Sequence, residues 1–425
     1  MHIFEEMESE VRGYVRAFPA IFDTAKCAHL YDEDGNSYID FFAGAGTLNY
    51  GHNNPIFSKA LIEYLQQDGI VHALDKATVA KRAFMEKFRD TILKPRGLDY
   101  KMQFTGPTGT NSVETALKLA RMVKGRSNVI AFTNGYHGLT MGSLAVTGND
   151  FYRDESYGAR NNADSVPFDG YLGDDVNTID YLRKFIADKS SGIDLPAAII
   201  VETVQGEGGI NVASAKWLQE LETLCHDFDI LLIVDDIQMA NGRTGTFFSF
   251  EEAGIKPDMV TISKSIGGGL PMALLLMRPE LDQWKPGEHT GTFRGNNLAF
   301  VAATKALSYW DNDDFADSIA YKGKIIEEAL QGIVNKYPDL EIKLRGRGMV
   351  WGLDFGPTGF AGEISKAAFE NYLLIELAGS KDNVLKFLPP LVIAEETLRE
   401  GLAIIDRVMG ELLESNQLRP KRAAL

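Results

Sequence analysis

Short apolar runs alternate with longer segments of helical period through the middle of the chain. Residues 128–132, 197–201, 230–234 and 259–262 form four such runs. A strand formed by each run would be buried on both faces, as in a parallel sheet that helices cover on both sides. The pattern therefore predicts an α/β fold with a mostly parallel sheet. Ligands of such sheets bind beyond the carboxyl ends of the strands, so the residues that follow each run are the candidates for chemistry.

The two ends of the chain follow a different pattern from the middle. YDEDGNSYIDFFAG predicts a β-hairpin with its turn at Asp34-Gly35. Residues 322–337 have the period of an amphipathic helix, and the following EIKLRGRGMVWGLDF alternates like strands of an antiparallel sheet. We therefore predict a large domain of residues 61–320. Residues 1–60 and 321–425 together would form a smaller α+β domain.

The charge of the chain restricts its partners. The 425 residues include 43 basic and 59 acidic side chains, which gives a formal net charge of −16. Because this charge repels other polyanions, nucleic acid and anionic membranes are not expected partners.

Cysteine content and the lack of membrane signals restrict the location. Cys27 and Cys225 lie in unrelated contexts, so neither a disulfide nor a metal site is predicted. We find no basic and apolar leader and no apolar run of the roughly 18 residues that a bilayer requires, so a cytoplasmic location is expected.

A glycine-rich turn is a candidate phosphate site. KMQFTGPTGTNSVETALKLARMV predicts a strand that ends at Thr105 and a helix that begins near Asn111. The backbone amides of Gly109 and Thr110 would then lie at the positive end of the helix, which suits an anion. An ordinary turn, with Asn111 capping the helix, explains the same residues.

A pair of aspartates closes one of the buried runs. In DILLIVDDIQMANGRTG, Asp235 and Asp236 follow the strand directly. Burial disfavours an ionised carboxylate, so a cation or a hydrogen-bond donor is expected close by. The alternative is that one aspartate only caps the turn that follows.

A lysine follows another buried run. In DMVTISKSIGGGLPMA, Lys264 lies between a strand and three glycines. Desolvation there would lower the pKa of its amine and make it a nucleophile that can form a Schiff base. Lysine at such a loop can equally bind phosphate as a point charge, or simply face solvent.

Together, a phosphate cradle, a carboxylate and an amine are the groups that pyridoxal phosphate requires of a protein. In order and spacing, TGTNSVE, FTNGYHG, VETVQGEGG, DDIQMANGRTG and SKSIGGGLP resemble the subgroup III aminotransferases, which act on ω-amino groups. The resemblance extends over nearly the whole chain. It implies a fold-type I transferase that depends on pyridoxal phosphate.

The resemblance implies a role for three residues at the cofactor ring. Lys264 would bind the cofactor's aldehyde and then move a proton during the reaction. Asp235 would pair with the pyridine nitrogen, and Gln238 would lie near the phenolic oxygen.

Further cofactor contacts follow from the same resemblance. Tyr136 would stack on the ring, and the phosphate would rest on Gly109 and Thr110. His137 is interpreted as a buried, hydrogen-bonded neighbour. Thr292, in HTGTFRGNN, matches a threonine that reaches the cofactor phosphate of the neighbouring subunit, so a homodimer or a larger homo-oligomer is implied. The alternative for Thr292 is a loop hydroxyl that bonds to its own backbone.

Two positions depart from the family pattern around the substrate. Many members have an arginine after the YHG motif, whereas this chain has Leu139, which cannot bind a carboxylate. Glu202 matches a glutamate that pairs with an arginine near the C-terminus, and Lys386 in NVLKFLPPL replaces that arginine. A Glu202–Lys386 pair is therefore expected at the substrate site, unless Lys386 is only a lysine at a strand edge.

Three arginines are candidates for the missing carboxylate contact. Arg12 and Arg16 belong to a segment that would otherwise be an exposed amphipathic helix. Arg294 lies where relatives more often have glycine.

The substrate class follows from the resemblance alone. ESEVRGYVRAFPAIFDTAK, YIDFFAGAGTLNYGHNNP and GTFRGNN are most similar to the members that form 2,4-diaminobutyrate. The implied substrates are an amino acid and an oxo acid: glutamate would aminate L-aspartate 4-semialdehyde and give L-2,4-diaminobutyrate and 2-oxoglutarate, the first step of ectoine biosynthesis. Alternatives are ornithine, 4-aminobutyrate or a diamine as amino donor, an aminomutase or decarboxylase on the same fold, or a non-enzymatic protein whose glycine-rich loops imitate the pattern.

Overall fold

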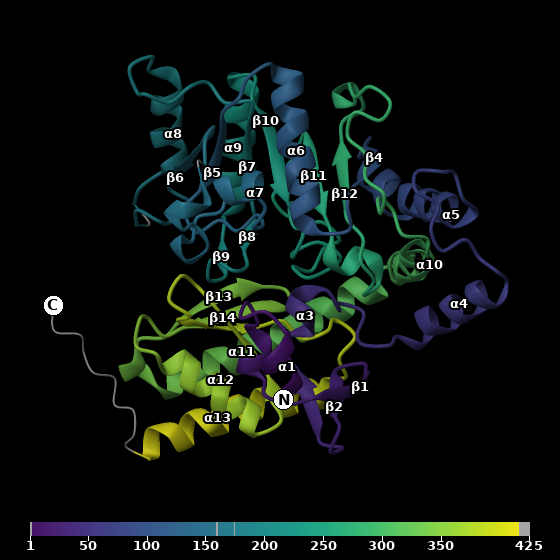
Figure 1. The fold of residues 1–425 in the computed structure, drawn as a ribbon. Coiled ribbons are helices and arrows are strands. Elements are labelled where there is room, and N and C mark those ends of the chain that lie inside the picture. The colour runs from purple at the N-terminus through teal and green to yellow at the C-terminus, as the bar shows by residue number, and fades with distance from the viewer. Residues whose placement is uncertain (1, 159, 174, 416–425) are drawn as a thin grey trace.

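A seven-stranded sheet forms the centre of the molecule (Figure 1). The computed structural model describes residues 2–158, 160–173 and 175–415. In spatial order the strands are β4 (Lys101–Phe104), β12 (Leu274–Met277), β11 (Met259–Ile262), β10 (Leu231–Asp235), β7 (Ala198–Val201), β5 (Val129–Phe132) and β6 (Ala163–Val166). Only β12 runs antiparallel to its neighbours within this sheet. The predicted α/β fold with a mostly parallel sheet is confirmed.

Helices cover both faces of this sheet because successive residues of a strand point to opposite sides. Ile130 and Phe132 of β5 belong to one apolar core, and Val129 and Ala131 belong to the other. The helix α6 (Gly109–Lys124) packs into the second core. The first core contains side chains of α5 (Val79–Phe88), α8 (Thr178–Ala187), α9 (Ala215–Asp227) and α10 (Asn297–Ala306).

Two smaller sheets lie below the central one in Figure 1. The first contains β1 (Phe22–Lys26), β2 (His29–Asp32), β3 (Ser37–Asp40) and β15 (Leu373–Leu374). The second contains β13 (Lys343–Arg347), β14 (Val350–Asp354), β17 (Val384–Phe387) and β16 (Glu376–Ala378), all antiparallel. The predicted hairpin at Gly35 and the predicted antiparallel strands near residue 350 are both confirmed.

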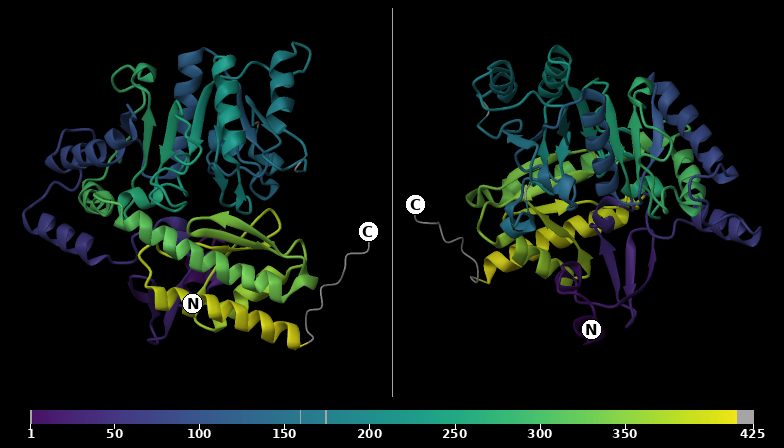
Figure 2. Two further views of the ribbon diagram at one scale, coloured as in Figure 1. Left: turned by 180° about the vertical axis from the view of Figure 1, so that it is seen from behind. Right: turned by 45° about the horizontal axis from the view of Figure 1, so that its top comes forward.

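Residues from both chain ends share one apolar core in this lower part. Ile39 and Phe41 pack in the same cluster as Ile325 and Leu385, and β15 pairs with β3 in parallel. Three helices cover the cluster: α11 (Asp314–Lys336), α12 (Phe360–Glu370) and α13 (Glu395–Glu414). Figure 2 shows α11 and α13 side by side beneath the strands.

The predicted domain boundaries fall inside helices. The boundary at residue 60 lies within α4 (Pro55–Gln66), and the boundary at 320 lies within α11. The predicted third part includes residues 416–425, which lie outside the described residues. The division into a large and a small domain stays a prediction.

The remaining elements are short. The helices are α1 (His2–Met7), α2 (Tyr14–Ala17), α3 (Ala43–Gly46) and α7 (Met141–Ala145), and the strands are β8 (Val204–Gln205) and β9 (Asn211–Val212). The other single turns are η1 (Arg89–Leu93), η2 (Lys94–Arg96), η3 (Asp150–Tyr152), η4 (Glu155–Tyr157), η5 (Lys264–Gly267), η6 (Pro279–Leu281), η7 (Leu307–Trp310) and η8 (Pro338–Leu340).

A buried arginine joins the central sheet to both chain ends. Arg243, in the loop after β10, is fully buried. Its guanidinium donates to the carbonyls of Met349 at 3.0 Å and Pro389 at 2.6 Å, and to Asn49 Oδ1 at 2.5 Å. A hydrogen-bonded fork of this kind fixes the relative positions of the three segments that it contacts.

Candidate active site

The carboxyl ends of the central strands surround a cavity of about 310 Å³. The site arises because parallel strands present their carboxyl ends at one edge of the sheet. Residues that line the cavity are Thr108, Gly109, Thr110, Tyr136, His137, Gly138, Leu139, Glu202, Glu207, Asp235, Ile237, Gln238, Met239 and Lys264. The structure thus brings seven of the predicted site residues to one cavity: Gly109, Thr110, Tyr136, Glu202, Asp235, Gln238 and Lys264.

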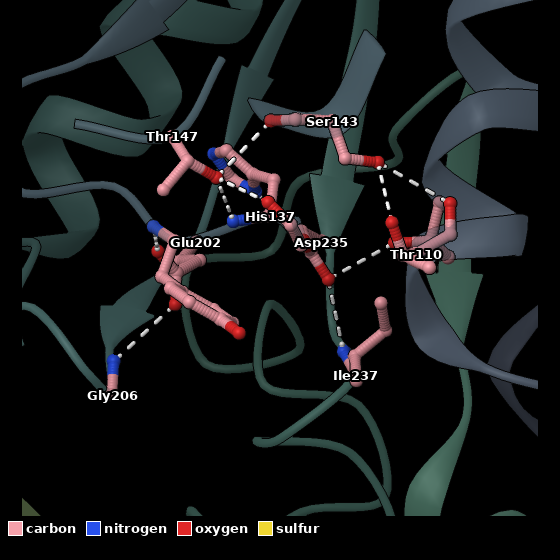
Figure 3. Close-up of polar contacts among 11 residues, drawn as sticks. Thr110, His137, Ser143, Thr147, Glu202, Gly206, Asp235 and Ile237 are labelled. Atoms are coloured by element: carbon pink, nitrogen blue, oxygen red, sulfur yellow. Dashed lines mark hydrogen bonds and ion pairs between the residues drawn. The ribbon is translucent and has the colours of Figure 1, made fainter. Parts of the chain in front are cut away.

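Hydrogen bonds hold both oxygens of the Asp235 carboxylate (Figure 3). Asp235 Oδ2 lies 2.7 Å from His137 Nδ1. Asp235 Oδ1 accepts from Thr261 Oγ1 at 3.0 Å and from the Ile237 amide at 3.2 Å. The contact with Ile237 is the turn cap that the sequence left open, but Asp235 also faces the cavity. The carboxylate therefore has a fixed direction.

His137 is a buried partner of this carboxylate, as the sequence predicted. Burial alone would lower the pKa of its imidazole, but the hydrogen bond and the negative charge of Asp235 outweigh burial and raise that pKa.

Asp236, the second aspartate of the pair, points away from the cavity. It is fully buried, and its Oδ2 accepts from the Ser249 amide at 3.0 Å. Its Oδ1 has no hydrogen-bond partner among the described residues. Burial is the largest cause that raises the pKa of this carboxyl to about 7.

We expect Asp236→Asn to make the free energy of unfolding of the protein less dependent on pH. The wild-type carboxyl has a higher pKa in the folded than in the unfolded chain, so folding retains a proton that the unfolded chain releases. Wild-type stability should therefore fall as pH rises from about 4 to about 7. The variant cannot ionise there, so its free energy of unfolding relative to wild type should be higher at pH 8 than at pH 5. The change is bounded by roughly 1.4 kcal/mol per pKa unit. Urea unfolding at the two pH values measures it, and an equal difference at both values contradicts the assignment.

Lys264 directs its amine into the cavity. Lys264 Nζ donates to the carbonyl of Ala45 at 2.8 Å. Burial is the main cause that lowers the pKa of the amine, which favours the neutral, nucleophilic form. The backbone of Lys264 has a φ of +52°, a left-handed conformation that is uncommon for residues other than glycine.

The carbonyl that Lys264 contacts belongs to a left-handed turn that the sequence analysis missed. The four residues of α3 all have positive φ, including Ala43 at +48° and Ala45 at +55°. Asp40 Oδ1 holds the start of the turn by accepting from the amides of Phe42 at 2.8 Å and Ala43 at 2.7 Å. The alternation of alanine and glycine in residues 43–46 is the signal that could have indicated it.

The side-chain amide of Gln238 has one atom, its oxygen, that forms no hydrogen bond with the described residues. Its Nε2 donates to the carbonyl of Ala45 at 3.0 Å and to Glu207 Oε1 at 3.1 Å. Its Oε1 is buried and has no hydrogen-bond partner among the described residues. A side chain at Gly206 would clash with this oxygen, because its Cβ would lie 1.8 Å away. The site thus holds a polar atom that a ligand can satisfy.

The first turn of α6 is open to an anion. The helix begins at Gly109, two residues before the predicted start, and its N-cap is Thr108. Asn111 does not cap the helix: its Oδ1 instead accepts from Thr108 Oγ1 at 2.8 Å. No described side chain caps this turn, so the positive helix end can bind phosphate. Thr110 Oγ1 lies beside it, 2.9 Å from Ser143 Oγ.

The predicted pair of Glu202 and Lys386 is wrong. Glu202 instead accepts from the amides of Tyr136 at 2.9 Å and Gly206 at 3.3 Å. Lys386 Nζ lies 2.7 Å from Glu207 Oε1 and 2.5 Å from Glu376 Oε1. Lys386 is also fully buried, so it is not a solvated lysine at a strand edge.

The strand register explains this correction. Glu376 of β16 lies directly opposite Lys386 of β17, where cross-strand side chains interact. Glu207 follows the turn at Gly206 and lines the same cavity as Glu202. The motif VETVQGEGG contains both glutamates, and the sequence analysis chose the first one.

Arg12 and Arg16 do not line the cavity. Arg12 is buried and donates to the carbonyl of Phe4 and to Glu10. Arg16 donates to the carbonyls of Glu10 and Arg12, each at 2.8 Å. Both arginines therefore form hydrogen bonds within the N-terminal segment itself. Their contacts with substrate stay predictions.

Thr292 and Arg294 lie on a loop away from the cavity within this chain. Thr292 is exposed, and its carbonyl lies 2.8 Å from His72 Nε2. Arg294 lines a separate cleft beside α5. Leu139 does line the cavity and presents an apolar side chain there. A contact of Thr292 with a second subunit stays a prediction.

The described residues contain neither a metal-binding cluster nor a membrane-spanning helix. No group of three or more His, Cys, Asp or Glu side chains among them is placed to hold a metal ion. None of their helices combines the length and the apolar character that crossing a membrane requires.

Comparison with known proteins gives consistent matches. Residues 12–409 match the family described as aminotransferase class-III. A diaminobutyrate–2-oxoglutarate transaminase of Wolinella succinogenes is 63% identical over 99% of this chain and 98% of its own. A protein of the same name from Bordetella parapertussis is 54% identical, with 98% and 97% covered. Among solved structures, an ornithine aminotransferase of Toxoplasma gondii with partial occupancy of PLP superposes with a TM-score of 0.84 at 26% identity, with 98% and 95% covered.

Proposed function

The chain belongs to the class-III aminotransferase family, and from this premise we propose that it transfers an amino group between glutamate and L-aspartate 4-semialdehyde. The products are L-2,4-diaminobutyrate and 2-oxoglutarate, in the first step of ectoine biosynthesis. The observation that carries this proposal is the 63% identity, over 99% of the chain, to a diaminobutyrate–2-oxoglutarate transaminase. At that identity, we expect most residues that line the active site to be the same in the two proteins.

The cofactor is pyridoxal phosphate, and the residues of the cavity fit it. Asp235 offers a fixed carboxylate for the ring nitrogen, and Lys264 offers an amine for the aldehyde. The unpartnered Oε1 of Gln238 can accept a hydrogen bond from a ligand donor such as a phenolic O–H. The uncapped start of α6, at Gly109 and Thr110, suits the phosphate.

The residues of this chain have distinct roles in the reaction. When bound, the cofactor supplies an aldehyde that takes up the amino group and a ring that accepts an electron pair. Asp235, fixed by hydrogen bonds with His137 and Thr261, places its carboxylate where it would stabilise a protonated ring nitrogen. Lys264, whose pKa is lowered by burial, would take the proton from the reacting carbon and return it. Glu202 fixes the backbone of Tyr136 in the wall of the cavity.

We also propose that the chain functions as a homodimer or a larger homo-oligomer. Large apolar side chains are exposed around the loop of Thr292, including Phe293, which is 68% exposed, and Val79, which is 73% exposed. Exposed apolar groups of this size are typical of an interface. Light scattering should give at least twice the 46.9 kDa of one chain; the mass of a single chain contradicts the proposal.

We further propose that the protein is located in the cytoplasm. Both cysteines are unbridged, Cys27 at the surface and Cys225 in the core, as expected in a reducing compartment. Cell fractionation tests this, and activity recovered outside the cytoplasmic fraction contradicts it.

The direct test of the reaction uses purified protein loaded with pyridoxal phosphate. With L-2,4-diaminobutyrate and 2-oxoglutarate we expect glutamate and L-aspartate 4-semialdehyde in equal amounts, identified by mass spectrometry. Ornithine, 4-aminobutyrate and a diamine serve as rival donors, and a higher kcat/KM for any of them overturns the substrate assignment. Product formed without 2-oxoglutarate would instead indicate an aminomutase or a decarboxylase.

A further inference from the structure

A second cavity, of about 670 Å³, lies next to the cavity that contains Lys264. The two cavities share Tyr136 and Glu207 as wall residues, so they adjoin. Tyr14 of α2 and Glu376 of β16 also line the second cavity. A substrate whose amino group reacts beside Lys264 would extend its other end into this space.

The second cavity is acidic. The described residues that line it include four acidic side chains, Asp150, Glu207, Glu376 and Asp382, and no lysine, arginine or histidine. Asp150 and Asp382 are exposed, whereas Glu376 is buried. A concave wall that carries one sign of charge attracts a ligand of the opposite sign. The cavity therefore suits a cation.

Lys386 does not neutralise both of the inner carboxylates. Its Nζ lies 2.7 Å from Glu207 Oε1 and 2.5 Å from Glu376 Oε1. When both carboxylates are ionised, the single ammonium of Lys386 balances only one of them. A buried charge of this kind is costly unless a cation binds to it.

Of the two carboxylates, Glu376 is the one that lacks a full counter-charge. Burial would raise the pKa of Glu207, but the positive charges of Lys386 and Lys264 outweigh it and lower that pKa to about 2. Burial outweighs Lys386 at Glu376 and raises its pKa to about 7. Glu207 is thus the ionised partner of Lys386, and Glu376 would gain most from a further cation.

Aromatic side chains complete the surroundings of Glu376. Tyr14 Oη lies 3.5 Å from Glu376 Oε2. The rings of Tyr136 and Tyr152, which also line the cavity, lie edge to face with centroids 5.7 Å apart. A cavity lined by both aromatic rings and carboxylates is a favourable environment for an organic ammonium group.

We propose that this acidic, aromatic cavity binds the second, non-reacting ammonium group of the amino substrate, and that Glu376 is the residue that selects for it. The inference rests on the proposed function, in which that group is the α-ammonium of 2,4-diaminobutyrate. Glu376 is linked to the cavity of Lys264 by contacts, because Lys386 bridges it to Glu207, which lines both cavities.

The matching pair of substrates is 2,4-diaminobutyrate and 4-aminobutyrate. The second compound keeps the reacting amine, the chain length and the carboxylate, and lacks only the α-ammonium. The ratio of their kcat/KM values therefore isolates recognition of that group. A carboxylate that pairs with the ammonium in a buried site should contribute at least about tenfold to this ratio.

The experiment measures this ratio with loaded wild-type enzyme, with Glu376→Gln, and with the control Glu363→Gln. Glu363 is exposed on α12 and lines neither cavity, so its substitution removes the same charge without touching the site. We expect the wild type and the control to prefer 2,4-diaminobutyrate by tenfold or more. In Glu376→Gln the KM for 2,4-diaminobutyrate should rise about tenfold, while kcat/KM for 4-aminobutyrate changes less than about threefold.

The possible outcomes separate this inference from the proposed function. A wild-type enzyme that does not use 2,4-diaminobutyrate refutes the proposed function itself. Wild type that uses both substrates equally well, or Glu376→Gln that keeps the full preference, overturns the role of Glu376 alone. Even when the variant fails to fold, a wild-type enzyme without the preference overturns the inference.

Discussion

Replacing Lys264 by alanine should abolish transamination while the protein stays folded. The amine that reacts with the cofactor and moves the proton is lost, and general acid–base catalysis alone is typically worth about 10²- to 10⁴-fold in rate. Turnover measured with 2,4-diaminobutyrate and 2-oxoglutarate should therefore fall by at least that factor. The visible absorbance that the cofactor has when bonded to a lysine should disappear as well.

Lys322→Ala is the matched control for this variant. Lys322 is also partly buried, its pKa is also lowered by burial, and its Nζ donates to the carbonyl of Leu391 at 2.7 Å. It lies on α11 and does not line the cavity of Lys264. The control should retain activity and absorbance, and circular dichroism should show native helix content in both variants. If Lys264→Ala keeps a tenth of wild-type activity, its assigned role is wrong.

Asp235→Ala should weaken cofactor binding and activity together. The substitution removes the carboxylate that faces the cavity, and it leaves His137 buried without its 2.7 Å partner. Losing a buried, hydrogen-bonded charge partner typically costs about 2–5 kcal/mol, so the Kd for pyridoxal phosphate should rise at least tenfold. Titration of the cofactor into the apo-protein, followed by fluorescence, measures this change.

Asp236→Asn serves as the control for Asp235→Ala. Asp236 belongs to the same pair but points away from the cavity, toward the Ser249 amide. Its substitution should leave the Kd for the cofactor unchanged. Equal cofactor affinity in wild type and Asp235→Ala would mean that Asp235 only caps the turn at Ile237.

The sequence could place Asp235 and Lys264 at one edge of the sheet because the ends of parallel strands meet there by topology. Asp235 directly follows one buried run, and Lys264 lies two residues beyond another. Once the runs are read as neighbouring parallel strands, the two side chains must approach one another. The helix at Gly109 was placed two residues late, because Thr108 and Asn111 are both residue types that cap helices.

The sequence could not predict which groups Glu207 and Glu376 contact. The pairing of Glu376 with Lys386 depends on the register of β16 against β17, and a shift of one residue would turn Glu376 to the other face. The choice between Glu202 and Glu207 depends on the turn at Gly206. The left-handed turn at Ala45 is itself local, since Asp40 lies three residues before Ala43, and only the contact of this turn with Lys264 is tertiary. Such tertiary contacts leave no local pattern.

The most direct test of the account asks which lysine holds the cofactor. Borohydride makes the bond between pyridoxal phosphate and its lysine permanent, and peptide mass spectrometry then locates the label. We predict the label on the peptide that contains Lys264, and none after Lys264→Ala. A label on Lys386 or on any other lysine, or no label on the loaded wild-type protein, would contradict the assignment of this cavity.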